Sequence, residues 1–264
     1  DVIDNFLSFD FAKLNNLDKY IEYKENDFKK IVFDNKNMDG MIISLNENYG
    51  YSYANNLGLK LAYDMGFEYA IVANPDTEVI NIDYFDILKD KLDFVALFPE
   101  VRGVKNEIQG LYYDKNWFQL LIFNYLNVFY KIYDRLYKSI LKKKSYKNDY
   151  IPINYSIGCF ILFNLKEFEK LGFFDSNVFL YGEEQILYQK IKKVGKKIYY
   201  SAKLQVNHNH YYKALNEFVK KEHQKSRIYY YKNYKKYPLF LIKILEFSSR
   251  FREETYEKIY SKLK

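Results

Sequence analysis

The sequence has one cysteine and no long apolar run, and each shortage excludes a class of protein. A single cysteine, Cys159, excludes an internal disulfide framework, and its apolar neighbours indicate a small buried side chain. Because no stretch approaches about 18 uninterrupted apolar residues, we expect no membrane-spanning helix. The first residues also lack the charged-then-apolar order of a signal peptide, so we expect a cytoplasmic protein.

The residues that are abundant are aromatic and basic. The 264 residues include 30 tyrosines and 22 phenylalanines, and the formal net charge is +7. With 48% hydrophobic and 28% charged positions, the chain can bury a substantial core as one domain or one domain plus an appendage. Net charge alone is compatible with nucleic acid, an anionic membrane surface or phosphorylated small molecules as partners.

Strand-like and helix-like segments alternate along the chain, which predicts an α/β fold with a mostly parallel sheet flanked by helices. Residues 1–5 are typical of the end of a buried strand, so a strand is expected to be missing upstream. Residues 12–33 are typical of a helix with a connecting segment. Further strand-like runs lie at 41–45, 67–73, 94–98, 157–163 and 197–202, and helix-like segments at 55–65, 117–144, 166–171, 183–194 and from 215 onward, interrupted at Pro238.

Two polar clusters follow predicted strands. The glycine-containing loop at 46–58 leads into a helix, where backbone N–H groups attract phosphate, although such a loop is as often a capped turn. The sequence Asn-Pro-Asp-Thr-Glu at 74–78 offers oxygen ligands suited to a divalent cation bridging a diphosphate, with a capped turn as the alternative. Ligands of parallel sheets bind at the carboxyl ends of strands, and we expect Asp4 and Asp76 at such ends.

Ionisable side chains later in the chain suggest further chemistry. Glu183 and Glu184 begin a predicted helix, where they either complement its dipole or provide a general base whose pKa the neighbouring carboxylate raises. His208 and His210 point the same way in an extended chain, so they either share a metal or phosphate site or form an exposed pair without function. His223 lies in a charged helical segment, and we expect it at the surface.

In this order, the motifs resemble the family-2 glycosyltransferases with a GT-A fold, particularly the rhamnosyltransferase-like branch of bacterial surface-polysaccharide synthesis. The resemblance covers roughly residues 1–212. Residues 48–58 resemble the branch's Asn-x-Gly-aromatic-…-Asn-Asn-x-Gly segment, and 74–78 its form of the Asp-x-Asp metal motif. The pair Gly-Phe-Phe-Asp at 172–175 and Tyr-Gly-Glu-Glu at 181–184 resembles the family's Gly-x-Phe-Asp-…-Glu-Asp stretch.

The resemblance implies roles for individual residues. Asp76 would be a metal ligand, and His208 matches the histidine that closes the site near the metal. Glu184 stands in the place of the catalytic-base aspartate but is a methylene longer, so the choice between Glu183 and Glu184 stays open. The residues implied in nucleotide binding are Asp4, Asn48, Gly50, Asn55, Asn56 and Asn74.

The chain also departs from the family pattern at its start. The family's usual N-terminal strand and its turn are absent from this sequence. Asp34 competes with Asp4 for the match to the nucleoside-contacting aspartate of the family's second strand. We favour Asp4, because little room remains between Asp34 and the strand at 41–45 for the intervening helix.

The resemblance further implies an inverting transferase that uses a nucleotide-diphosphate sugar and a divalent metal, Mn²⁺ or Mg²⁺. A hexosyl group, such as rhamnosyl, would pass to a glycan or lipid-linked oligosaccharide in capsule or lipopolysaccharide synthesis. We expect a catalytic domain over residues 1–212, with a helical insertion at 117–150, and a basic aromatic helical segment over 213–264. The basic aromatic helices suit peripheral contact with the inner face of an anionic membrane, and helix packing with solvated lysines is the alternative.

Other functions compete with this interpretation. A glycoside hydrolase needs two carboxyl groups about 5 Å or more apart across one bond, and the adjacent Glu183 and Glu184 do not face each other across a sugar. A nucleotidyltransferase of similar architecture would share the metal site without needing these glutamates. A nucleotide-, membrane- or nucleic-acid-binding module without transferase activity is the alternative from another class, since interleaved aromatics and lysines also stack bases. Nucleic acid is the least favoured partner.

Overall fold

The computed structural model describes residues 20–24, 40–81, 92–209 and 216–261. The chain divides into two compact units, residues 1–49 and 50–264. In the first unit, β1 (Tyr20–Lys24) pairs in parallel with β2 (Gly40–Ser44). The helix predicted within residues 12–33 is therefore wrong over β1, whose aromatic and β-branched residues favour a strand once a partner strand is present. Asp4 and Asp34 lie outside the described residues.

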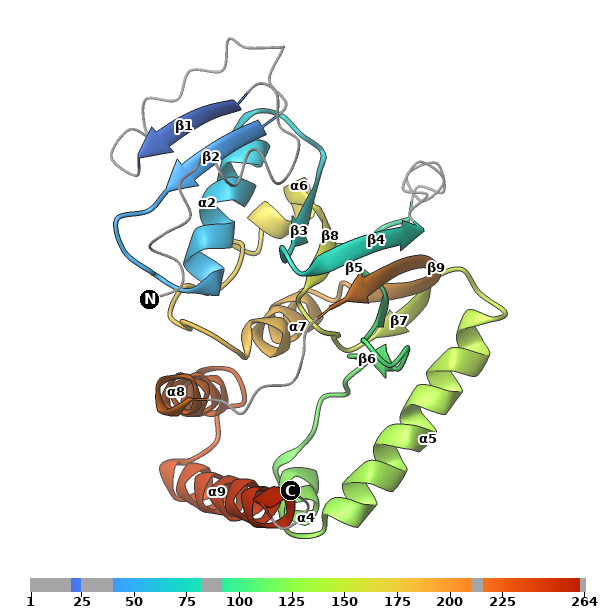
Figure 1. Ribbon diagram of the computed structural model, residues 1–264, viewed down its shortest axis with the longest axis vertical. Coiled ribbons are helices and arrows are strands. Elements are labelled where there is room, and N and C mark those ends of the chain that lie inside the picture. Colours follow the sequence, from blue (N-terminus) through green and yellow to red (C-terminus); the bar gives the residue numbers. More distant parts are fainter. Residues whose placement is uncertain (1–19, 25–39, 82–91, 210–215, 262–264) are drawn as a thin grey trace. The chain divides into compact units, whose positions relative to one another are not determined.

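The second unit is built on a seven-stranded sheet (Figure 1). Its strands are ordered β3-β8-β5-β9-β4, while β6 pairs with β5 and β7 pairs with β9. The mixed α/β architecture with flanking helices and a helical C-terminal segment is as predicted. The strands are β3 (Tyr69–Ala73), β4 (Thr77–Asn81), β5 (Ala96–Arg102), β6 (Ile108–Gln109), β7 (Ile151–Ile153), β8 (Phe160–Asn164) and β9 (Ile198–His208).

Strand directions in this sheet are more mixed than the predicted mostly parallel arrangement. Strands β5 and β9 run parallel, whereas the other pairs of described strands in the sheet are antiparallel. The prediction assumed that each helix carries the chain back to start a parallel strand. Between β6 and β7 the chain instead runs through two helices, α4 (Trp117–Tyr125) and α5 (Asn127–Ser145), and α5 brings it back to the antiparallel strand β7 (Figure 1). Alternation of elements therefore did not determine strand direction.

One face of the sheet is covered by α2 (Tyr51–Asp64), α6 (Leu165–Glu169) and α7 (Glu183–Lys193). Successive side chains of a strand point to opposite faces, and β8 follows this rule. Ile161 and Phe163 belong to the main core with these helices, whereas Leu162 belongs to a smaller cluster with Phe94 and Leu97. Cys159 is buried, as its apolar neighbours indicated.

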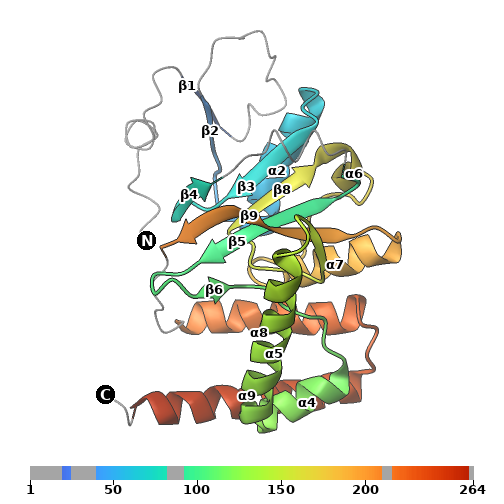
Figure 2. The same cartoon turned by 90° about the vertical axis from the view of Figure 1, so that its right-hand side faces the viewer.

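A layer of helices packs against the far side of α7. It contains α4, α8 (Glu217–Asn233) and α9 (Leu239–Ser261), and Figure 2 shows α8 and α9 side by side. Helix α7 joins the layers, because Leu187 packs in the sheet core and Ile186 packs with Tyr230 and Leu245. The predicted interruption at Pro238 separates α8 from α9. These two helices form most of the predicted segment 213–264 and belong to the same compact unit as the sheet.

The single helix predicted over 117–144 is divided into α4 and α5. Leu126 leaves the helical conformation, with φ −118° and ψ 67°. The preceding turn is anchored elsewhere, since the Asn124 amide donates to Ser248 Oγ at 2.9 Å and Ser249 Oγ at 3.2 Å. This tertiary contact has no local sequence signal such as proline or glycine. Within the described residues, no helix is long and apolar enough to cross a membrane.

Candidate active site

The predicted metal-binding turn connects β3 to β4, and the sheet brings it to His208. Thr77 lies opposite His208 in the antiparallel pair of β4 and β9. The backbone N–H of Asn209 donates to the Asp76 carbonyl at 2.9 Å. Asp76 Oδ2 is then 3.5 Å from His208 Nε2. The two residues that the sequence paired as metal ligands are therefore neighbours, while His210 lies outside the described residues.

The orientation of the His208 ring follows from the contact of its other nitrogen. Nδ1 lies 2.9 Å from Gln109 Oε1, and the Gln109 amide donates through Nε2 to Glu107 Oε1 at 3.3 Å. This second bond places the amide oxygen, which only accepts, toward His208. Nδ1 therefore donates to Gln109, and Nε2 is the ring nitrogen that faces Asp76. An imidazole held in this way is suited to metal binding.

Metal ligands beyond this pair are scarce in the described part of the chain. No group of three His, Cys, Asp or Glu side chains converges there to hold an ion. The His208 side chain is 9% exposed, and that of Asp76 is 38% exposed. The Asp76 carboxylate can therefore reach a ligand in solvent, but the two side chains would form only part of a metal's coordination shell.

The two glutamates begin α7, as predicted. Glu184 Oε1 accepts a hydrogen bond of 2.8 Å from the backbone N–H of Gly158. The Tyr51 hydroxyl donates to the Gly158 carbonyl at 2.7 Å. A Cβ atom at Gly158 would lie 2.6 Å from Glu184 Oε1, so a larger residue there would displace the carboxylate. This peptide group fixes the position of the Glu184 carboxylate.

The next residue, Cys159, holds the candidate metal-binding turn. Its carbonyl accepts from the backbone N–H of Asn74 at 2.8 Å and from Thr77 Oγ1 at 3.3 Å. Burial raises the pKa of the Cys159 thiol to about 12, and the nearby carboxylates of Asp76 and Glu184 contribute to this rise. The consecutive residues Gly158 and Cys159 therefore lie between the predicted metal ligand and the predicted base.

The environments of the two glutamates differ. Burial, followed by the charge of Glu184, raises the pKa of Glu183 to about 9, so Glu183 is protonated at neutral pH. Its residue exposure is 6%, and Oε2 has no hydrogen-bond partner within the described residues. Burial also raises the pKa of Glu184, while backbone hydrogen bonds, including that from Gly158, oppose the shift. As a whole residue Glu184 is less completely buried than Glu183, and its role as the base stays a prediction.

Two of the predicted nucleotide-binding residues hold the loop before α7. Gly50 has φ 87°, and a Cβ atom there would lie 2.3 Å from the Phe179 carbonyl oxygen. The Asn56 amide donates to the Phe174 carbonyl and accepts from the Phe174 N–H, both at 2.9 Å. These bonds give Asn56 a structural role, and its predicted contact with a nucleotide stays a prediction.

The other predicted nucleotide contacts, Asn48, Asn55, Asn74 and Asp4, stay predictions. Asn48 is exposed and belongs to the first unit. The Asn55 amide donates to the carbonyl of Tyr51, one turn earlier in α2, at 2.9 Å. Asn74 contributes its backbone to the turn, where its carbonyl accepts from the Thr77 N–H at 3.1 Å. Asp4 lies outside the described residues.

Several residues of the site were not predicted from the sequence. Tyr51 belongs to the recognised loop, but nothing in the pattern indicated that its hydroxyl reaches Gly158. A glycine beside a predicted strand can mark a close backbone approach, and this was the available signal for Gly158. Gln109 had none, because β6 is only two residues long.

Comparisons with known proteins give no family assignment. No protein-family model matches the chain, and no curated protein matches it. One similar solved structure is titled "Crystal structure of GalNAc-T7 with UDP, GalNAc and Mn2+", with 16% identity, a TM-score of 0.46, and coverage of 84% of this chain and 46% of that one. Another is "Crystal Structure of A197 from STIV", with 11% identity, a TM-score of 0.39, and coverage of 75% and 99%. This chain thus spans less than half of the first structure, and neither low score decides an activity.

Proposed function

We propose that this chain is an inverting glycosyltransferase of the GT-A type, which moves a hexosyl group from a nucleotide-diphosphate sugar to a glycan acceptor. The observation that carries the proposal is the junction at Gly158 and Cys159. A base candidate is held at Gly158, and the turn with a metal-ligand candidate is held at Cys159. A transferase needs these two functions on either side of one reacting carbon.

The donor end of the site would be built by Asp76 and His208. A carboxylate oxygen and an imidazole lone pair fit a divalent ion, and the nitrogen ligand favours Mn²⁺ over Mg²⁺, which prefers oxygen. When bound, the ion would supply neutralisation of the leaving diphosphate. The remaining ligands would be diphosphate oxygens and water, consistent with the absence of a third converging side chain in the described residues.

The acceptor end would be built by Glu184. Its carboxylate takes the proton from an acceptor hydroxyl, whose oxygen attacks the anomeric carbon opposite the departing diphosphate and inverts that carbon. One base is sufficient for this reaction, and no covalent intermediate forms. Glu183, protonated at neutral pH, adds no second negative charge beside the base.

The finer assignments follow from the motifs. We infer a rhamnosyl or other hexosyl donor and a role in bacterial capsule or lipopolysaccharide synthesis, with a lipid-linked oligosaccharide as acceptor. The exposed face of α9 supports contact with an anionic membrane. This helix buries Ile242 and Leu245, yet exposes Phe240 and Phe247 by 67% and 68%. A helix that is apolar on two faces needs a second apolar partner.

The first experiment is calorimetric binding of UDP, dTDP, GDP and CMP with and without Mn²⁺. We expect one nucleotide to bind in a metal-dependent manner, and Asp76→Ala and His208→Ala to abolish that binding. Asp64→Ala is the control, because Asp64 is an exposed carboxylate at the end of α2, outside the cluster at 74–78. Nucleotide binding that is equal with and without metal would contradict the proposed donor site. Wild-type nucleotide affinity in the Asp76→Ala variant would contradict it as well.

A second assay separates the transferase from a nucleotidyltransferase of similar architecture. Incubation with a sugar 1-phosphate and nucleoside triphosphates would release pyrophosphate if the chain were a nucleotidyltransferase, and Glu184→Gln would leave that reaction intact. We expect no pyrophosphate. We expect instead slow hydrolysis of a nucleotide sugar, in which water takes the place of the acceptor. This reaction releases the nucleoside diphosphate, and Glu184 accepts the proton of the attacking water.

A further inference from the structure

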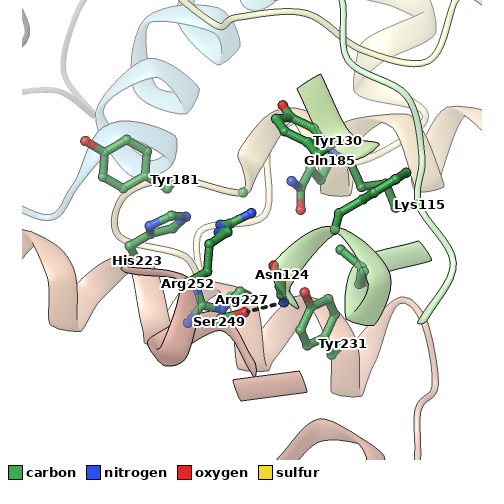
Figure 3. Close-up of a pocket in the computed structure, with 13 residues that line it drawn as sticks. Lys115, Asn124, Tyr130, Tyr181, Gln185, His223, Arg227, Tyr231, Ser249 and Arg252 are labelled. Atoms are coloured by element: carbon green, nitrogen blue, oxygen red, sulfur yellow. Dashed lines mark hydrogen bonds between the residues drawn. The ribbon is translucent and has the colours of Figure 1, made fainter. Parts of the chain in front are cut away.

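A cavity of about 140 Å³ lies in the second unit, between the helical layer and the start of α7 (Figure 3). One water needs about 10–15 Å³ of such space, so the cavity can hold a group of several heavy atoms. Its walls come from α4, α5, α7, α8 and α9. Tyr181 and Gly182, immediately before the two glutamates of α7, line one end.

The lining is rich in positive charge. Lys115, Arg227 and Arg252 all contribute to it, and Figure 3 shows Arg252 extending from α9 between His223 and Gln185. His223 was expected at the surface, but it is partly buried and packs against the ring of Tyr181 at 4.9 Å. Burial, followed by the charge of Arg227, lowers the pKa of His223, so its ring is a neutral hydrogen-bonding group at neutral pH.

The three cations are not equally compensated. Arg227 donates two hydrogen bonds to the Glu246 carboxylate, at 2.7 and 3.0 Å, and one to Glu253 at 3.2 Å. In contrast, none of the ion pairs within the described residues involves Lys115 or Arg252. Lys115 Nζ instead lies over the rings of Tyr113 and Tyr130, at 4.7 and 5.2 Å from their centres.

Lys115 and Arg252 also repel each other. Burial, followed by the charge of Arg252, lowers the pKa of Lys115 to about 8, despite opposing attraction from Asp134 and Asp114. Asp114 is already engaged, because its carboxylate accepts a hydrogen bond from Lys235. Two like charges at a partly buried cavity destabilise the fold unless an anion compensates them. A ligand with about two negative charges would do so.

We propose that this cavity binds a phosphate or diphosphate group carried by the acceptor, and so anchors the acceptor beside α7. A phosphate monoester carries about −1.5 to −2 at neutral pH, which matches the charges of Lys115 and Arg252, the two lining cations without an ion pair within the described residues. The planar guanidinium of Arg252 suits paired contacts to phosphate oxygens, and Lys115 supplies a point charge. The carrier's identity rests on the proposed transferase function, whereas anion binding does not.

The direct test is calorimetric titration with inorganic pyrophosphate in the presence of a chelator, so that no metal occupies Asp76 and His208. We expect Arg252→Gln and Lys115→Gln to weaken binding at least tenfold, and Arg252→Lys to retain part of it. Arg250→Gln is the matched control, because Arg250 is exposed on the same helix and lies outside the cavity lining. Thermal unfolding of each variant identifies any loss caused by misfolding.

The outcomes separate this site from the proposed donor site. Wild-type affinity for pyrophosphate in Arg252→Gln would show that the cavity is not the anion site. An equal loss of affinity in Arg250→Gln would show the same. Asp76→Ala should bind pyrophosphate normally even if metal-dependent nucleotide binding is never found. In that case, the anion site stands and the transferase proposal fails.

The carrier is identified with two further probes, farnesyl diphosphate and glucose 1-phosphate. Tighter binding of farnesyl diphosphate than of pyrophosphate, lost in Arg252→Gln, would support a lipid-linked acceptor. Preferential binding of glucose 1-phosphate, lost in the same variant, would support a phosphorylated glycan. Binding of either probe that is unchanged in Arg252→Gln would contradict the anchoring role.

Discussion

The carboxylate of Glu184 accepts a hydrogen bond of 2.8 Å from the backbone N–H of Gly158. The following carbonyl, that of Cys159, accepts from the backbone of Asn74 and the hydroxyl of Thr77. Two adjacent backbone groups therefore position the base candidate and the candidate metal-binding turn. Backbone groups of a folded chain have less conformational freedom than long side chains, so they hold their partners in place more firmly. A catalytic site requires pre-organisation of this kind.

Replacement of Gly158 by alanine should strongly reduce activity with little effect on folding. The new Cβ would lie 2.6 Å from Glu184 Oε1, and a displacement of about 1 Å at a reacting group costs about 100-fold in rate. We expect kcat of Gly158→Ala to fall by about that factor, with nucleotide affinity unchanged. Gly58→Ala is the control, since a Cβ in that helical position meets nothing within 4 Å. Wild-type kcat in Gly158→Ala would show that the contact is unimportant.

The two glutamates should respond differently to amide substitution. Glu184→Gln removes the proposed base, so we expect kcat to fall by about 10²- to 10⁴-fold while nucleotide binding is retained. Glu183→Gln imitates the protonated side chain already present at neutral pH, and at least half of the activity should remain. Steady-state kinetics on both variants provide the measurement. The reverse ranking would assign the base to Glu183.

The acid limb of the rate profile should lie above the ordinary range of glutamate. The base must be deprotonated to accept a proton, and burial raises the pKa of Glu184 from its usual value of 4.5. We therefore expect kcat to increase with pH through a midpoint above 4.5. Repeating the profile with Gly158→Ala is informative, because loss of the backbone hydrogen bond should move the midpoint further upward. A midpoint at or below 4.5 would be inconsistent with Glu184 in this environment.

Glu183 should also make stability depend on pH. Its pKa is about 9 in the folded protein and 4.5 as the usual value, so the folded state binds the proton more tightly. The stabilising contribution is complete below about pH 4.5 and is lost as pH rises through 9. Chemical unfolding between pH 5 and 9 should show a decline in the wild type that is reduced in Glu183→Gln. Parallel curves for the two proteins would contradict a buried, protonated Glu183.

Local sequence patterns predicted the elements better than their connections. The helix at 183–193 and the strand at 160–164 follow from apolar periodicity and were predicted within a few residues. The pairing of β8 between β3 and β5 was not predictable, because antiparallel partners are chosen by tertiary packing. The break at Leu126 was missed for the same reason, since the Asn124 contacts come from α9.

The candidate site was predictable where motif order sufficed. The family resemblance paired Asp76 with His208 as metal ligands, and their side chains lie 3.5 Å apart. The bond between Gly158 and Glu184 was not predictable, because no spacing relates a glycine before a strand to a distant helix. The cationic cavity was also missed, since Lys115 and Arg252 are far apart in the chain and His223 was expected at the surface.

Gln109 should act as a positioning residue for His208. Its amide oxygen accepts from Nδ1 and so orients the ring with Nε2 toward Asp76. Loss of such a contact typically lowers metal affinity by about 10- to 100-fold. We expect this loss of Mn²⁺ affinity in Gln109→Ala, measured calorimetrically with saturating nucleotide, and recovery in Gln109→Glu, which again offers an acceptor. Gln205→Ala is the control on the strand that carries His208. Unchanged affinity in Gln109→Ala would exclude a positioning role.

The exposed face of α9 should bind anionic bilayers. Phe240, Ile244, Phe247 and Phe251 follow one another at intervals of three or four residues, and the ring of Phe251 lies 5.3 Å from that of Tyr125 at the end of α4. This stripe joins the two helices into one apolar surface, and the exposed Lys243 beside it would contact lipid phosphates.

Vesicles of phosphatidylglycerol and phosphatidylcholine test this surface by flotation at low and high salt. Phe247→Ser should reduce the bound fraction several-fold, because it removes one of the most exposed apolar side chains on the stripe. Phe67→Ser is the matched control, since Phe67 is 56% exposed and lies outside α9. The single tryptophan, Trp117 of α4, should show a blue shift as the wild type binds. An equal vesicle-bound fraction for the two variants would assign the membrane contact to another surface. A loss of binding in Phe247→Ser alone would establish that α9 faces the lipid.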